Sequence, residues 1–84
     1  AKLERCDDHA SARAAELAGG RLLCIGDGLY TDIRGANAYG ADALLVEKGI
    51  HEQDLAPFHA DMPALAEELT RRRLQARYVT GSLA

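Results

Sequence analysis

The stretch CIGDGLYTDIRGANAYG, residues 24–40, decides how this 84-residue chain is expected to fold. It overlaps the apolar run Leu22–Ile25, which is bounded by glycines and predicts a parallel strand covered on both faces. The strand leads into Gly-Asp-Gly, and a second acid, Asp32, follows five residues after Asp27. We expect a helix to begin near Asp32 and to end at Gly40, because glycine commonly follows a helix C-terminus. The stretch therefore predicts a strand, an acidic loop and a helix.

Helices and strands are expected to alternate on both sides of this stretch. Upstream, small and apolar residues recur at helical spacing between Asp8 and Gly19, which predicts a first helix. Downstream we expect, in chain order, a buried strand at Ala43–Val46, a helical turn at Glu52–Leu55, a helix capped by Asp61 and a short strand starting at Ala76.

The resulting order, α-β-α-β-α-β, indicates the fold class. Strands that alternate with helices imply right-handed crossovers and a parallel sheet. We therefore predict an α/β fold of the Rossmann-like, three-layer α/β/α type, with about three parallel strands. We expect one domain that spans residues 1–84. A sheet this narrow has at least one open edge, and unpaired edges favour strand addition, so a homo-oligomer formed through that edge is one expectation.

Composition and charge exclude several classes of partner. The chain has a net charge of −3 and only 5% aromatic residues, whereas nucleic-acid binding needs a basic surface with stacking aromatics. No apolar run is long enough to predict a membrane span. The cysteines Cys6 and Cys24 are too few for a disulfide framework or a zinc site, and they suit a reducing compartment. We therefore expect a cytoplasmic protein without a nucleic-acid or membrane partner.

The acids at the end of the Leu22–Ile25 strand form the candidate functional site. In open parallel sheets, ligands bind just beyond the carboxyl ends of the strands, where Asp27 lies. Gly26 and Gly28 allow close approach of the backbone, and the loop between them can bring Asp32 near Asp27. Hard oxygen ligands beside a helix N-terminus suit Mg²⁺ together with a phosphate group. The same acids also fit an ordinary turn residue and a first-turn helix residue, and their spacing does not decide between these interpretations.

The segment GDGLYTDIRGANAYGADALLVEKGIH, Gly26–His51, resembles the fourth conserved motif of haloacid dehalogenase-like phosphatases. The similarity is to the class IIA, sugar-phosphatase type, which carries a large inserted cap. The shared pattern is Gly-Asp, a short loop, Thr-Asp-Ile, Gly-Ala, a further Gly, an apolar strand and Gly-Ile-His. The final ARYVTGSLA also resembles the closing strand of that family, although Ala76-Arg77 stand where Pro-Asp is usual. The resemblance implies the C-terminal part of such an enzyme.

This resemblance implies a Mg²⁺-dependent hydrolase of small phosphate esters. In that family an Asp nucleophile forms an aspartyl-phosphate, and the acids of the fourth motif hold the metal. Asp27 would then be the direct Mg²⁺ ligand, and Asp32 would act through a water molecule or orient the site. Tyr30 and Gly28, in the same loop, would lie on the side of the small phosphorylated substrate.

The resemblance also shows what this sequence lacks. Lys2 stands at the spacing of the phosphate-binding lysine of the third motif, but the usual Gly-Lys-Pro is here Ala-Lys-Leu, and a solvated lysine near the terminus is the alternative. No Asp-x-Asp-like run follows a predicted strand, so the nucleophile is not in this chain, and neither is the cap that selects the substrate. We therefore expect a C-terminal fragment that is inactive alone. The alternative is a non-catalytic α/β module that binds a partner or a second copy through its open sheet edge.

Each of the remaining candidates, His51, His59 and Arg71–Arg73, has an interpretation as a surface residue. His51 belongs to the family-like loop, where it either lines the site or lies on a surface loop. His59 is interpreted as a surface residue. Arg71–Arg73 are interpreted as the solvated end of a helix, where positive charge is favourable to the helix dipole.

Overall fold

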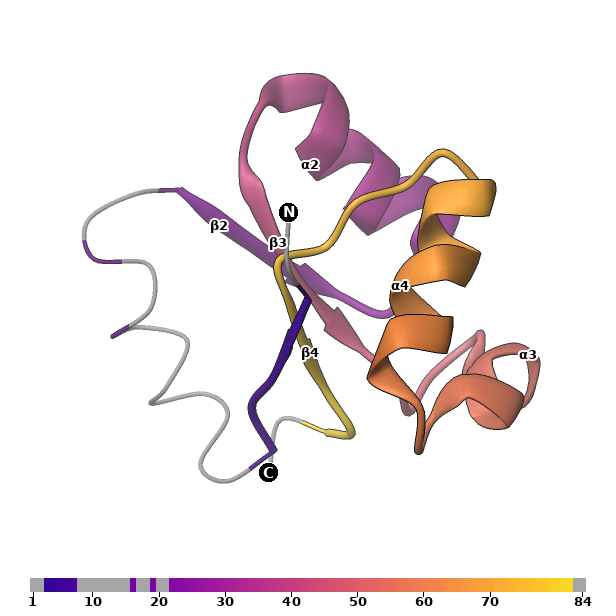
Figure 1. Ribbon diagram of the computed structural model, residues 1–84. Coiled ribbons are helices and arrows are strands. Elements are labelled where there is room, and N and C mark those ends of the chain that lie inside the picture. The colour runs from indigo at the N-terminus through magenta and orange to yellow at the C-terminus, as the bar shows by residue number, and fades with distance from the viewer. Residues whose placement is uncertain (1–2, 8–15, 17–18, 20–21, 83–84) are drawn as a thin grey trace.

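The computed structural model of the protein describes residues 3–7, 16, 19 and 22–82 (Figure 1). The helix predicted between Asp8 and Gly19 lies almost entirely outside these residues, and so does Lys2. In the described part, no helix is long and apolar enough to cross a membrane.

The described residues form a parallel sheet of four strands in the order β1-β4-β3-β2. Its strands are β1 (Glu4–Arg5), β2 (Leu23–Gly26), β3 (Asp42–Val46) and β4 (Tyr78–Thr80). The helical elements are the π-helical turn η1 (Leu29–Ile33), α2 (Arg34–Tyr39), α3 (Glu52–Leu55), the 3-10 turn η2 (Ala56–Phe58) and α4 (Met62–Arg71). The predicted Rossmann-like α/β fold with a parallel sheet is confirmed.

The core lies between one face of the sheet and the helices. Ala43 and Leu45 of β3 face this core, where Ile33 before α2 and Leu69 of α4 are also buried. Leu44 points to the opposite face and packs with Tyr78 in a smaller cluster. This alternation agrees with the side-chain period of a strand, and it explains why the run 43–46 is apolar at every position.

Strand β2 differs from the prediction that both of its faces are covered. Leu22 is 56% exposed and Ile25 is 42% exposed, whereas Leu23 and Cys24 are partly buried. The reason is its position, because β2 is an edge strand of the described sheet and pairs there with β3 alone. The apolar run does form a strand, but the sequence does not indicate which strand lies at an edge of the sheet.

Strand β1 was not predicted, and the sheet therefore has one more strand than expected. Its two residues, Glu4 and Arg5, pair with Tyr78 and Val79 of β4. They carry no apolar run that indicates a strand. The pairing is held by backbone hydrogen bonds, among them one from the Cys6 N–H to the Val79 carbonyl at 2.9 Å.

The helix boundaries largely follow the capping residues. Asp61 caps α4, and its carboxylate accepts a hydrogen bond from the Ala64 N–H at 3.1 Å. Helix α2 ends at Gly40, whose φ of 83° is readily adopted by glycine. The helical segment starts earlier than predicted, because Leu29–Ile33 forms a π-helical turn closed by a bond from the Ile33 N–H to the Gly28 carbonyl at 3.0 Å. Such turns are frequent at functional sites.

Candidate functional site

Asp27 lies immediately after β2, at the carboxyl end of the strand. Its Oδ2 atom accepts a hydrogen bond of 3.0 Å from the Ile50 N–H, which belongs to the loop after β3. Asp32 lies in η1, and its Oδ2 atom accepts a bond of 3.1 Å from the Gly28 N–H. Both carboxylates are therefore held by backbone amides, and their Oδ1 atoms make no hydrogen bond within the described residues.

Two glycines make room for these carboxylates, and a third makes room for a neighbouring hydroxyl. A Cβ atom on Gly26 would overlap the Asp32 carboxylate, and one on Gly49 would overlap the Asp27 carboxylate. A Cβ atom on Gly28 would collide with the Thr31 hydroxyl. In the structure, protein side chains occupy the space beside Gly26 and Gly28, and Gly49 joins these two glycines as a position of close approach.

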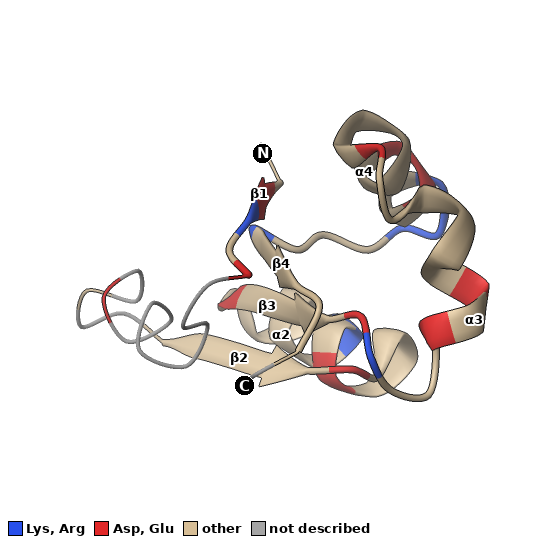
Figure 2. Ribbon diagram, turned by 90° about the horizontal axis from the view of Figure 1, so that it is seen from below, with Lys and Arg blue, Asp and Glu red and all other residues tan. Residues whose placement is uncertain are grey.

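The loops after β2 and β3 lie side by side and both carry acidic residues (Figure 2). Within the described residues, no group of three or more His, Cys, Asp or Glu side chains is arranged to hold a metal ion. Asp27 and Asp32 thus offer two carboxylates at most. This number fits Mg²⁺, which commonly keeps several waters and binds through one or two carboxylates plus substrate phosphate.

Tyr30 connects the η1 turn to the loop after β3. Its ring meets the His51 ring edge-on, with centroids 5.8 Å apart and an interplanar angle of 79°. The Arg34 guanidinium carbon lies 4.9 Å from the centroid of the Tyr30 ring, in cation–π geometry. Tyr30 remains 45% exposed. His51, interpreted from sequence as either a surface or a site-lining residue, therefore lies against the loop that carries the two acids.

Arg72 is not the solvated residue that the sequence suggested. Its side chain is only 17% exposed and donates two hydrogen bonds to Asp54, at 2.6 and 3.1 Å. It also donates to Glu68 at 2.7 Å and reaches the Tyr30 hydroxyl at 3.5 Å. These hydrogen bonds raise the pKa of Arg72, and the bonds from Arg72 hold the pKa of the Asp54 carboxyl below its ordinary value. By contrast, the Arg71 side chain is 73% exposed, as predicted for a solvated helix end.

A buried carboxylate that the sequence did not reveal lies at the carboxyl end of β3. Glu47 accepts hydrogen bonds from Arg5 at 2.6 and 3.2 Å, and the His59 Nδ1 atom lies 3.0 Å from its Oε1 atom. The bond to Glu47 raises the pKa of Arg5. His59 was interpreted as a surface residue, and its ring is mostly exposed, but one edge pairs with Glu47. The partners lie 42 and 12 residues away in sequence, so no local pattern indicates them.

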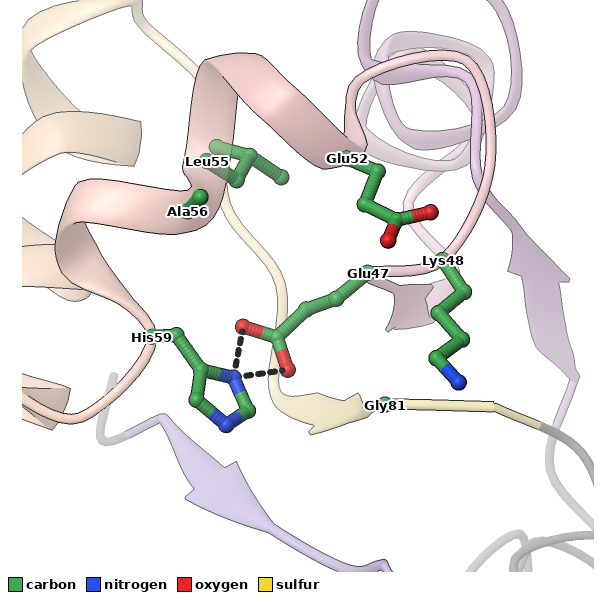
Figure 3. Close-up of a pocket in the computed structure, with 7 residues that line it drawn as sticks. All are labelled: Glu47, Lys48, Glu52, Leu55, Ala56, His59 and Gly81. Atoms are coloured by element: carbon green, nitrogen blue, oxygen red, sulfur yellow. Dashed lines mark hydrogen bonds and ion pairs between the residues drawn. The ribbon is translucent and has the colours of Figure 1, made fainter.

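Figure 3 shows the cavity beside this cluster, with the Glu47 side chain turned toward His59. The cavity has a volume of about 320 Å³ and lies between the end of β3 and α3. It is lined by Glu47, Lys48, Glu52, Leu55, Ala56, His59 and Gly81. Asp27 and Asp32 do not line it, so the cavity and the acidic loop after β2 are adjacent but distinct features.

Comparison with known families gives one result. A family model described as HAD-hydrolase-like matches residues 6–76, which is most of the chain. Comparisons with curated proteins and with solved structures gave no match.

Proposed function

The chain belongs to the HAD-hydrolase-like family, and on this basis we propose that it forms the metal-binding part of a Mg²⁺-dependent phosphatase for small phosphate esters. The observation that carries the proposal is the Asp27 carboxylate at the carboxyl end of β2, fixed through Oδ2 by the Ile50 N–H. Ligands of open parallel sheets bind at this end of the strands. We infer further that the enzyme is of the sugar-phosphatase type, because the segment Gly26–His51 resembles the motif of that type.

The proposed residue roles follow from the two carboxylates. Asp27 would hold Mg²⁺ through its Oδ1 atom, which leaves the bond to Ile50 intact. Asp32 would act through a water molecule, since its own Oδ2 atom is engaged by the Gly28 N–H. The bound metal would neutralise charge on the phosphoryl oxygens. Tyr30, which is half exposed beside the acids, would face the substrate.

We propose that the nucleophile is supplied by a part of the enzyme outside these residues. Among the described acids, Asp7 lies just beyond β1, a position that the sequence did not indicate. However, β4 and β3 separate β1 from β2, and Asp7 is engaged by the Gly81 N–H at 2.8 Å. Asp7 therefore does not face Asp27 across neighbouring strands. Lys2 remains a proposed phosphate-binding residue that lies outside the described residues.

The test of this function is phosphate release by a longer protein that carries the chain. With p-nitrophenyl phosphate as the probe, we expect turnover that requires Mg²⁺ and falls about 100-fold or more in Asp27→Asn. The 84-residue chain alone should release no phosphate. Undiminished turnover in Asp27→Asn would contradict the assignment of the metal ligand. The small number of cysteines in the sequence supports our further proposal that this enzyme is cytoplasmic.

A second candidate function is self-association through β2, which we propose on the exposure of its apolar side chains. Ile25 of β2 is exposed, and so is Leu22, which immediately precedes the strand. Strand β2 carries no charged residue, whereas natural edge strands are commonly blunted by charge. Light scattering should then give the mass of a dimer, and Ile25→Lys should return the monomer. A monodisperse monomer at high protein concentration would contradict this candidate.

A further inference from the structure

We propose that Arg72 is a positioning residue for the Asp27 carboxylate, and that it acts through Asp54, His51 and the Gly49–Ile50 backbone. This inference rests on the proposed function, in which Asp27 is a metal ligand. Arg72 lies 45 residues after Asp27 in sequence, and no motif singles it out. A series of contacts joins the two residues.

The first contact is between Asp27 and the loop after β3. The Ile50 N–H donates to Asp27 Oδ2 at 3.0 Å, and the Asp27 carboxylate fills the space where a Cβ atom of Gly49 would stand. The orientation of the carboxylate therefore depends on where the Gly49–Ile50 backbone lies. The Ile50 side chain is exposed and does not anchor this backbone.

The next contacts anchor the loop through the adjacent residue, His51. Its ring packs edge-on against Tyr30, and its carbonyl accepts a hydrogen bond from the buried Leu55 at 2.9 Å. The His51 Nδ1 atom lies 3.7 Å from Asp54 Oδ2, within ion-pair range when the imidazole is protonated. His51 thus fixes the loop between the acidic turn on one side and Asp54 on the other.

The last contacts are made by Arg72. Its guanidinium holds Asp54 with two hydrogen bonds, and its Nη1 atom reaches the Tyr30 hydroxyl. A planar guanidinium can make this paired contact, which the ammonium of lysine does not reproduce. Arg72 is itself held by the buried Glu68. One side chain therefore joins η1, α3 and the end of α4.

Arg71 provides a matched control for this inference. Both arginines pair with Glu68 at the end of α4, and both therefore contribute to the same helix end. Arg71 is paired with Glu68 and makes no hydrogen bond to Asp54 or Tyr30 among the described residues. A general effect on α4 should appear in both variants, whereas an effect on Asp27 should appear only when Arg72 is changed.

The experiment compares Arg72→Met and Arg71→Met in the 84-residue chain by NMR. We expect Arg72→Met to speed hydrogen exchange of the Ile50 amide about tenfold and to weaken Mg²⁺ binding, followed at the Gly28 amide, about tenfold. Arg71→Met should change the Ile50 exchange rate and the Mg²⁺ affinity by less than about twofold each. Arg72→Lys should give an intermediate effect. Asp54→Asn removes the same ion pair from its other side, so it should give the effects expected of Arg72→Met and replaces that variant if Arg72→Met folds poorly.

Two outcomes would overturn the inference: an unchanged Ile50 amide in Arg72→Met and Asp54→Asn, or equal effects in the Arg71 and Arg72 variants. Failure of the proposed function would look different. In that case Mg²⁺ would not shift the Gly28 amide of the unmodified chain, whereas Ile50 exchange would still separate Arg72→Met from Arg71→Met.

Discussion

Gly49→Ala is the substitution that should disturb the Asp27 carboxylate while leaving the rest of the fold intact. No left-handed φ is required at Gly49, so the backbone accepts alanine, but the new Cβ atom would overlap the Asp27 carboxylate. Asp27 must then turn away from the Ile50 N–H and give up a hydrogen bond of 3.0 Å. Hydrogen bonds to charged groups contribute about 1.5–3 kcal/mol, and the exposure of this one favours the lower value. We expect Gly49→Ala to lower the free energy of unfolding by about 1.5 kcal/mol.

The same substitution should weaken Mg²⁺ binding about tenfold, because about 1.4 kcal/mol corresponds to a factor of ten in affinity. The assay combines urea unfolding with a Mg²⁺ titration followed at the Gly28 amide. Gly35→Ala is the control, since a Cβ atom there meets nothing within 4 Å and Gly35 lies in α2. That variant should be stabilised by up to about 1 kcal/mol, with unchanged Mg²⁺ binding. If Gly49→Ala changes the unfolding free energy and the Mg²⁺ affinity in the same way as Gly35→Ala, the described position of the Asp27 carboxylate against Gly49 and Ile50 is wrong.

Three further predictions concern the surrounding contacts. Asp61→Ala should lower the free energy of unfolding, measured with urea, by about 1 kcal/mol, because the Ala64 N–H loses its capping acceptor. An unchanged urea midpoint would contradict the role of Asp61 as the helix cap. Glu47→Ala should lower the free energy of unfolding by about 2 kcal/mol, because Arg5 and His59 both lose their carboxylate partner. The control Glu52→Ala leaves that cluster intact and should lower the free energy of unfolding by less than about 0.5 kcal/mol. Arg72 lowers the pKa of Asp54, so the stability that this pair adds is fully present at neutral pH and is lost as the pH falls below about 4. The unfolding free energies of the unmodified chain and Asp54→Asn should therefore converge in acid, and a constant difference down to pH 2 would refute this linkage.

The parts of the fold that sequence could predict are those governed by local chemistry. The apolar run 43–46 indicated a buried strand, Asp61 indicated the start of α4, and Gly40 indicated the end of α2. Each signal depends on residues next to one another in sequence. The exposure of Ile25 could not be predicted in this way, because it depends on which strands flank β2.

Only the part of the candidate site that lies within one short stretch of sequence was predictable. Gly26, Asp27 and Asp32 stand together in one loop, and the family resemblance drew attention to them. The amide that holds Asp27 comes from Ile50, and the arginine that we connect to it lies beyond α4. A long side chain such as Arg72 is interpreted as solvated by default at a helix end, because only the fold brings Asp54 within its reach.

The central claim is that Asp27 at the end of β2 binds the catalytic metal, and its most direct test is paramagnetic. Mn²⁺ takes the same oxygen ligands as Mg²⁺ and broadens nearby NMR signals even when binding is weak. We predict that Mn²⁺ broadens the amide signals of Gly26, Gly28 and Ile50 first, that Mg²⁺ reverses the effect, and that Asp27→Asn abolishes it. Broadening that is unchanged in Asp27→Asn, or that centres on another part of the chain, would contradict the claim.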